Sequence, residues 1–160
     1  MASCLGVFFL LCGISGVFGA CPPDWEEEQD RCYMYKVGPN TFDGAEQVCI
    51  AALTGAHLVA INNVAEQTFV AAFIKEVAGD ASTHTWIGLH DSETDGSFAW
   101  TNVGTILVYE NFASGQPSGP KGIEDCVYID GSNDQWYDND CNVMNPFVCE
   151  GPVPEPEPEP

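Results

Sequence analysis

Hydrophobic residues in the first half of the chain recur at intervals of three and four positions, which is the period of an amphipathic helix. One such segment begins at Asn40-Thr41. A second follows Asn63, which has Glu66 three residues later as in a capping box, and ends at Gly79. The apolar positions that share a face are Phe42, Ala45, Val48, Cys49 and Ala52 in the first segment, and Val70, Ile74 and Val77, flanked by Phe69 and Phe73, in the second. We predict two helices whose apolar faces belong to the core.

Short apolar stretches predict strands, one between the helices and several after Gly79. They cover residues 58–61, 85–89, 98–101, 126–129 and 147–149. The stretches between the later strands are rich in Gly, Asp, Asn, Ser and Pro, and residues 109–125 show no pattern of regular structure. A long loop of this kind in a compact domain is either functional or a sign that the assignment of elements is wrong. The order of elements predicts an α+β domain with a loop-rich second half.

Both ends of the chain differ in composition from its middle. Residues 5–11 form an apolar run too short to span a bilayer, and small or β-branched residues precede Ala20, so residues 1–19 are expected to be a secretory signal peptide. A buried N-terminal helix is the alternative. Residues 20–150 then form the domain, and residues 151–160, which alternate Pro with Glu, form an extended tail. That tail is either a solvated spacer or an arm that touches a mineral or a basic partner.

Acidic residues dominate the charge of the chain. It has 24 Asp and Glu against 4 Lys and Arg, a formal net charge of −20. Nucleic acid and anionic membranes are therefore not expected as partners, because both are attracted by basic residues. The balance favours cations, or ligands that are held through a cation.

Cysteine usage indicates an oxidising compartment. Of the 8 cysteines, Cys4 and Cys12 lie in the expected leader, which leaves six for three disulfides. Counting alone leaves their connectivity open. A zinc site is the weaker interpretation, because the chain has no Cys-x-x-Cys and its three histidines are not at ligand spacing.

Several short motifs together resemble the C-type lectin-like domain. They are Cys21-Pro22, Cys49, residues 56–61, Trp86-Ile87-Gly88-Leu89, residues 96–100, Gly115-Gln116-Pro117-Ser118, residues 124–127, residues 136–141 and Phe147-Val148-Cys149. The resemblance implies an α+β fold with two helices, small antiparallel sheets and a long ligand-binding loop. It also implies three disulfides, namely Cys21–Cys32, Cys49–Cys149 and Cys126–Cys141.

The same resemblance places a calcium ion and a sugar in the long loop. Its metal ligands there correspond to Gln116, Ser118, Glu124 and Asp138, with Pro117 in the cis form between the first two. Calcium takes six to eight oxygen ligands, which suits amide and carboxylate side chains. A sugar then gives two neighbouring hydroxyls to the ion and contacts the ligating side chains. The expected sugar contacts are Gln116, Ser118, Glu124, Tyr137 and Asp138.

This chain departs from the family pattern at two of these positions. Ser118 stands where members with galactose or mannose specificity have a carboxylate or an amide, and Tyr137 stands where they have Asn. Gln116 is typical of galactose-type members. We therefore expect a secreted calcium-dependent lectin that binds galactose-type glycans, with mannose-type glycans second. The alternative is a lectin-like protein without sugar binding, which acts at a mineral or ice surface or as a protein-binding module.

Two further expectations concern metal and catalysis. By resemblance, Asp91, Asp95 and Asp125 match an auxiliary calcium site, with Gly119 where another acid would help. A solvated turn is the alternative for residues 91–95. No enzyme is expected, because nucleophile-elbow, dinucleotide-binding and zinc-protease motifs are all absent from the sequence. No insertion into a membrane is expected either.

Overall fold

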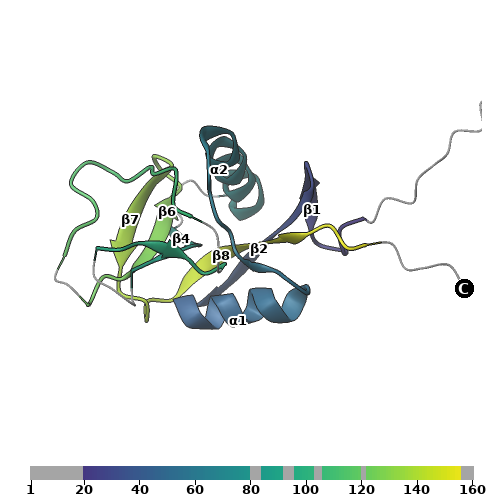
Figure 1. Ribbon diagram of the computed structural model, residues 1–160, viewed down its shortest axis with the longest axis horizontal. Coiled ribbons are helices and arrows are strands. Elements are labelled where there is room, and N and C mark those ends of the chain that lie inside the picture. The colour runs from purple at the N-terminus through teal and green to yellow at the C-terminus, as the bar shows by residue number, and fades with distance from the viewer. Residues whose placement is uncertain (1–19, 80–83, 92–95, 103–105, 120–121, 156–160) are drawn as a thin grey trace, which may run out of the picture.

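The computed structural model describes residues 20–79, 84–91, 96–102, 106–119 and 122–155. It contains two helices, α1 (Phe42–Ala52) and α2 (Val64–Ala78), on opposite sides of a sheet (Figure 1). The strands are β1 (Glu26–Glu28), β2 (Arg31–Asn40), β3 (His57–Leu58), β4 (His84–His90), β5 (Ala99–Trp100), β6 (Cys126–Asp130), β7 (Gln135–Asn139) and β8 (Asn145–Pro152). The predicted α+β class is confirmed.

Both helices begin at a side chain that caps free backbone N–H groups. Thr41 Oγ1 accepts the N–H of Gly44 at 3.2 Å, and Asn63 Oδ1 accepts those of Ala65 and Glu66 at 2.9 and 3.0 Å. Gly79 closes α2 in the left-handed region, with φ of 66°. The helix bounds agree with the prediction. The buried face of α2 is shifted from it: Phe73 is buried, whereas Val77 is 44% exposed.

Two antiparallel groups of strands share one sheet. Its order is β1-β2-β8-β4-β6-β7, with β3 added to β8 and β5 added to β4. The groups join where β4 and β8 pair in parallel at Trp86 and Phe147. Antiparallel pairing elsewhere agrees with the expected small antiparallel sheets.

Three strands are not predicted by the sequence, namely β1, β2 and β7. The three glutamates of β1 are all exposed, so they carry no apolar signal.

Strand β8 also continues past the expected end of the domain at residue 150. Gly151 and Pro152 pair with Cys32 and Arg31 of β2, so the expectation that Pro152 lies in an extended tail outside the domain was wrong. Proline is tolerated at a strand end because its missing N–H is not needed there.

The core consists of two clusters on the two faces of the sheet. One joins α2 to inward-facing residues of β4, β6, β7 and β8, including Trp136, and the other joins α1 to Trp86 and Phe147. The disulfide Cys49–Cys149 ties α1 to β8, and the others are Cys21–Cys32 and Cys126–Cys141. The pairing implied by the resemblance is confirmed.

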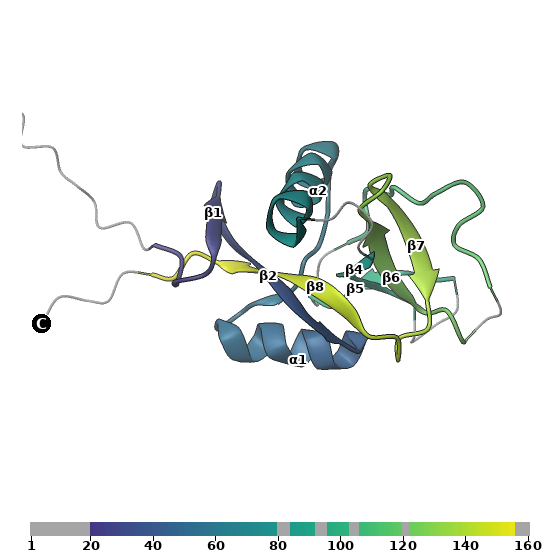
Figure 2. The ribbon, with the colours of Figure 1, turned by 180° about the vertical axis from the view of Figure 1, so that it is seen from behind.

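The two ends of the domain carry different segments of the chain. The first and last described residues emerge at one end, and the long loop between β5 and β6 curls around the other (Figures 1 and 2). The expected leader, residues 1–19, and residues 156–160 of the tail lie outside the described residues. Among the described helices, neither is long and apolar enough to cross a membrane.

Candidate calcium and glycan site in the long loop

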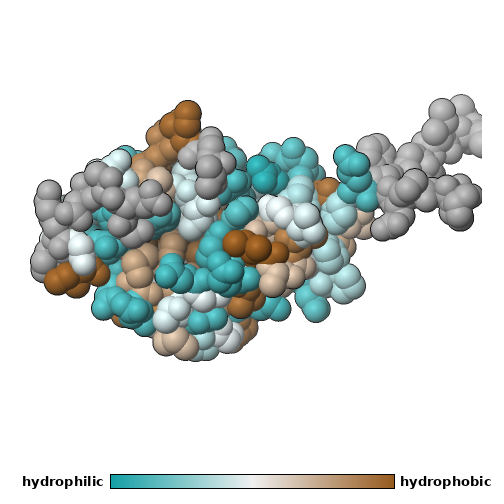
Figure 3. Space-filling view, turned by 60° about the horizontal axis from the view of Figure 1, so that its bottom comes forward, coloured by the Kyte–Doolittle hydropathy of each residue, from teal (hydrophilic) through white to brown (hydrophobic). Residues whose placement is uncertain are grey.

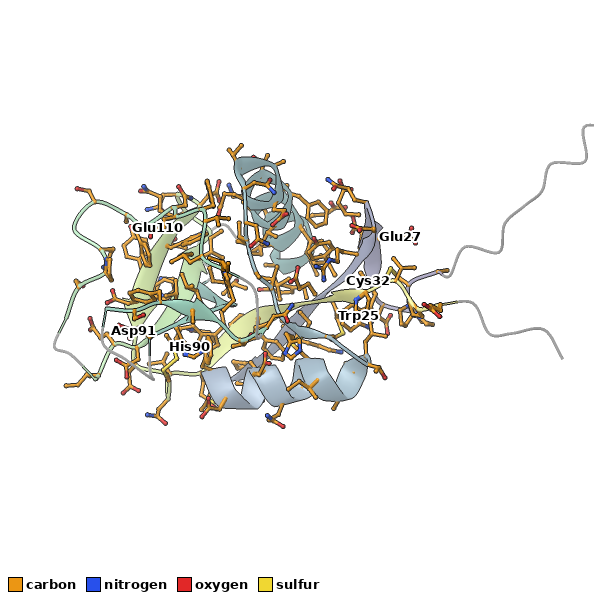
Figure 4. All side chains as sticks on the ribbon, viewed as in Figure 1. Trp25, Glu27, Cys32, His90, Asp91 and Glu110 are labelled. Carbon is orange, nitrogen blue, oxygen red and sulfur yellow. A yellow bond between two sulfur atoms is a disulfide. The ribbon has the colours of Figure 1, made fainter. Side chains whose placement is uncertain are left out.

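Strand order brings three of the predicted acids to one edge of the sheet. Asp91 directly follows β4, Asp125 directly precedes β6, and Asp138 lies near the end of β7. Because these neighbouring strands are antiparallel, those positions meet at the same edge. The N–H of Asp91 donates to the carbonyl of Asp125 at 3.0 Å. Figure 4 shows Asp91 at the end of the domain that carries the long loop.

The long loop is anchored to Trp136 on β7, two residues before Asp138. Phe112 forms a bridge with Trp136, the N–H of Ala113 donates to the Trp136 carbonyl at 3.0 Å, and the N–H of Trp136 donates to the carbonyl of Asn111 at 2.9 Å. The rings of Tyr109 and Phe112 meet the indole edge-on. Trp136 is completely buried. The loop is therefore held in place by packing as well as by hydrogen bonds.

The sequence alone does not identify the polar network beneath this anchor. Gln67 of α2 accepts the indole N–H of Trp136 at 2.8 Å and donates to the carbonyl of Asp134 at 2.9 Å. Asn111 donates to the same carbonyl at 2.7 Å. One signal was present: Gln67 is a polar residue adjacent to the apolar stripe of its helix, and it is only 6% exposed.

The loop then brings its backbone to Asp138. The peptide bond between Gln116 and Pro117 is cis, and the N–H of the next residue, Ser118, donates to both carboxylate oxygens of Asp138 at 2.9 and 2.8 Å. Asp138 is 8% exposed. Burial raises the pKa of its carboxyl, the Ser118 N–H opposes that rise, and the negative charge of Asp91 adds to it. The carboxylate of Asp91 is therefore close enough to Asp138 to disfavour its ionisation.

A glycine makes room for the second predicted carboxylate. Gly119 has φ of +86°, and a Cβ placed on it would overlap the carboxylate of Glu124. Glu124 thus lies against the loop backbone directly after Ser118. From the sequence, Gly119 was noted only as the position where another acid would help the auxiliary site. The structure shows that the absence of a side chain at Gly119 leaves room for the carboxylate of Glu124.

Two buried oxygens at this end have no hydrogen-bond partner among the described residues. They are Gln116 Oε1 and Asp91 Oδ1. The other oxygen of Asp91 accepts the N–H of Gly96 at 2.7 Å. Buried acceptors are normally paired, because an unpaired one costs about 1–3 kcal/mol. An unpaired amide oxygen and an unpaired carboxylate oxygen have the chemistry that a hard cation such as calcium needs.

The structure does not bring every predicted residue to this group. Tyr137 precedes Asp138 in β7, so its side chain points to the opposite face of the strand. Its ring stacks on Tyr128 at 5.5 Å between centroids, and its hydroxyl accepts from Asn133 at 2.8 Å. The expected sugar contact of Tyr137 is thus not placed with the others. Asp95 lies outside the described residues.

Comparison with known proteins agrees with this arrangement of fold and loop. The family model described as Lectin C-type domain matches residues 38–151. This chain belongs to the C-type lectin domain family. The lectin-like chain is 31% identical over 146 residues to C-type lectin 16 of Crotalus adamanteus, and the match covers 91% of this chain and 89% of that protein.

Solved structures show the same fold. The C-type lectin CEL-I from Cucumaria echinata superposes with a TM-score of 0.77 at 28% identity, over 84% of this chain and 99% of that one. A herring type II antifreeze protein superposes with a TM-score of 0.73 at 26% identity, over 84% and 100% of the two chains. This C-type lectin-like domain therefore has relatives whose names denote different activities.

Proposed function

We propose that this domain is a secreted, non-catalytic lectin that binds glycans through a calcium ion in the long loop. Gln116, Ser118, Glu124 and Asp138 would hold the ion, which would supply a Lewis-acidic centre for two sugar hydroxyls. The observation that carries the proposal is the meeting of Asp138 with the loop at Ser118, directly after the cis peptide that follows Gln116, whose buried side-chain oxygen has no hydrogen-bond partner among the described residues.

The ligand set is mixed rather than carboxylate-rich. Among the described residues, no three Asp, Glu, His or Cys side chains gather closely enough to hold a metal ion. The proposed set has two carboxylates, one amide and one hydroxyl, and calcium accepts all of these oxygens. Each Asp138 oxygen keeps a lone pair while it accepts from Ser118. Affinity rises with the number of charged ligands, so we expect weaker calcium binding than in a site with three carboxylates.

Galactose-type sugars are the favoured ligands, with mannose-type sugars second. Gln116 is an amide, so its oxygen can face the ion while its NH2 donates to a sugar hydroxyl. Tyr137 is engaged with Tyr128 and Asn133, so it adds no contact on this face. The disulfides support secretion, because they persist in oxidising compartments. The negative charge supports a cation-held ligand over a polyanion.

Two observations favour a second candidate, a lectin-like protein that acts at an ice or mineral surface without binding sugar. Tyr137 replaces an oxygen ligand and turns away, and one structural relative is named an antifreeze protein. A protein-binding module has less support: on the face in Figure 3, hydrophobic residues form separate patches among hydrophilic ones. Adsorption to ice or calcite without retention on sugar would favour the second candidate.

The deciding experiment combines calcium calorimetry with retention on galactose–agarose and mannose–agarose. We expect calcium to bind, the protein to be retained only with calcium, and chelator to elute it. Glu124→Gln should abolish retention, whereas Glu110→Gln should leave it unchanged. Glu110 is an exposed acid of the same long loop (Figure 4), so the two variants change the charge equally.

Three results would contradict the proposal at different levels. Failure of the wild type to bind calcium would remove the metal site. Calcium binding without retention on either resin would remove the sugar. Retention of Glu124→Gln with chelator elution would remove Glu124 from the ligand set.

A further inference from the structure

A pocket lies at the opposite end of the domain from the long loop. It has a volume of about 250 Å³ and is enclosed by the β1–β2 hairpin, the first turns of α2 and strand β8. Figures 1 and 2 show β1 and α2 rising from the same side of the β2–β8 ribbon. The lining residues that matter here are Arg31, Tyr33, Glu66, Phe69 and Glu150. None of them belongs to the proposed glycan site.

A buried carboxylate forms part of this pocket. Glu150 is 6% exposed and accepts a hydrogen bond from the N–H of Ala60. Within the described residues, Glu150 forms no ion pair. Burial raises the pKa of its carboxyl to about 7, although Arg31 and the Ala60 N–H oppose the rise. A carboxyl group buried in this way is stable either as the protonated acid or as a carboxylate paired with a cation.

Aromatic rings line the pocket beside that carboxylate. The rings of Tyr33 and Phe69 meet edge-on with centroids 4.8 Å apart, and Phe69 stacks on Phe73 at 5.8 Å. Tyr33 is 4% exposed, and burial together with the charge of Glu150 raises the pKa of its phenol, so it stays neutral. Aromatic faces attract organic cations, most strongly where the cation is desolvated.

Charged groups face Glu150 from every surrounding element, and negative ones prevail. Glu28 of β1, Asp30 of the turn and Glu66 of α2 line the pocket with it, against the single guanidinium of Arg31 from β2. His57 of β3 lies opposite Glu150 and is bound to Glu46 of α1 at 2.6 Å. Within the described part of the chain, Arg31 forms no ion pair. The pocket is therefore negative overall, with one base at its side.

A metal ion suits this pocket poorly. Glu66 is occupied at the start of α2, where its oxygens accept from Asn62 and Asn63 at 2.7 to 3.1 Å. Glu28 and Asp30 also line the pocket but are exposed, so Glu150 is the buried carboxylate left to a ligand, whereas a hard cation needs about six to eight oxygens. An organic ammonium needs only one anion and apolar walls.

We propose that this pocket binds a small organic ammonium ion with an apolar body, which pairs with Glu150 and lies against the rings of Tyr33 and Phe69. Binding places a positive charge beside a buried carboxylate that has no ion-paired partner among the described residues. Since the ammonium competes with a proton for Glu150, affinity should rise with pH through neutrality. The site is independent of the proposed glycan function.

The test is an NMR titration of the folded domain with n-butylammonium chloride at pH 8, with sodium chloride as the salt control. We expect saturable shifts of resonances around Tyr33 and Phe69. Glu150→Gln should weaken binding about tenfold or more, because a charge-assisted contact is lost. The matched control is Glu27→Gln, an equal charge change at an exposed residue of β1 outside the pocket lining (Figure 4), which should leave binding unchanged.

A second pair of measurements fixes the sign of the ligand charge. Arg31→Met should tighten n-butylammonium binding by removing a like charge. If it weakens that binding, or if butyrate binds instead, the pocket takes anions and the proposal is overturned. Equal losses in Glu150→Gln and Glu27→Gln would also overturn it, as would the absence of saturation. Phe69→Leu, which preserves the charge but removes the ring, should weaken binding and serves if Glu150→Gln fails to fold.

Discussion

The backbone N–H of Ser118 donates to both carboxylate oxygens of Asp138, at 2.9 and 2.8 Å. This contact joins the long loop, directly after its cis proline, to the end of β7. It holds the carboxylate in place with loop backbone rather than with a neighbouring base. The proposed calcium ion would therefore meet a partly organised site, which lowers the cost of ordering the loop on binding.

Gly119→Ala should weaken calcium binding, because the added methyl group would displace the Glu124 carboxylate. The matched control is Gly115→Ala, since Gly115 also has a positive φ, of 88°, but has open space around it. Each variant should lose on the order of 1 kcal/mol of stability through backbone strain. Only Gly119→Ala should lose about tenfold in calcium affinity, as expected for a charged contact. Calorimetry measures this, and equal affinities in the two variants would contradict the assignment.

Gln67→Met should destabilise the domain by about 1–3 kcal/mol, because it leaves the buried indole N–H of Trp136 without an acceptor. Lys75→Met is the comparison, because Lys75 is on the same helix as Gln67 and forms an ion pair with Asp134. The side chains of Lys75 and Asp134 are 42% and 35% exposed. Loss of this ion pair should cost less than about 1 kcal/mol. Urea unfolding followed by tryptophan fluorescence gives both values. A larger loss of stability in Lys75→Met would show that the ion pair between Lys75 and Asp134 contributes more than the hydrogen bond between Gln67 and Trp136.

Stability should depend on pH through Glu150. Its folded pKa is about 7 against an ordinary value of 4.5, so the folded state holds a proton that the unfolded chain has already released. This stabilisation is complete below the ordinary pKa and is lost as pH rises through about 7. The contribution is on the order of 3 kcal/mol.

The variant Glu150→Gln isolates that contribution from those of the other titrating groups. Its free energy of unfolding should fall less than that of the wild type between about pH 5 and about pH 8. It should also exceed the wild-type value at the higher pH. Chemical denaturation at several pH values measures this, and parallel pH profiles of the two proteins would refute the assignment.

Loss of the disulfide Cys49–Cys149 should destabilise the domain more than loss of Cys21–Cys32. The first spans 100 residues and the second spans 11. Opening a disulfide raises the entropy of the unfolded chain, so the expected losses of stability are about 5 and about 3 kcal/mol. The measurement is thermal unfolding of the two double Cys→Ala variants. The opposite order of melting temperatures would show that local packing, and not loop closure, decides.

Local chemistry made much of the fold predictable. Thr41, Asn63 and Gly79 mark helix ends because capping side chains and a left-handed glycine act within one turn. The apolar strands were visible because their residues are buried on the sheet. The long irregular loop and the family resemblance then located Gln116, Pro117, Ser118, Glu124 and Asp138.

Other features depend on neighbours that are distant in sequence. Strand β1 consists of exposed glutamates, so only its pairing with β2 makes it a strand. Tyr137 occupies a family ligand position, yet it directly precedes Asp138 in β7, so its side chain lies on the opposite face of the strand, stacked on Tyr128. The sequence did not predict a strand at these residues, and only the pairing of β7 with β6 makes them one and so sets the face of each side chain.

The sequence by itself determined the helices, the cysteine content, the acidic charge and the family of this protein, because these follow from residue type and short-range spacing. Only the tertiary structure decided that Ser118 meets Asp138 through its backbone, that Gly119 makes room for Glu124 and that Gln67 supports Trp136. It also placed Glu150 in a pocket at the far end. These are contacts between distant segments, and the packing of the whole sheet sets their geometry.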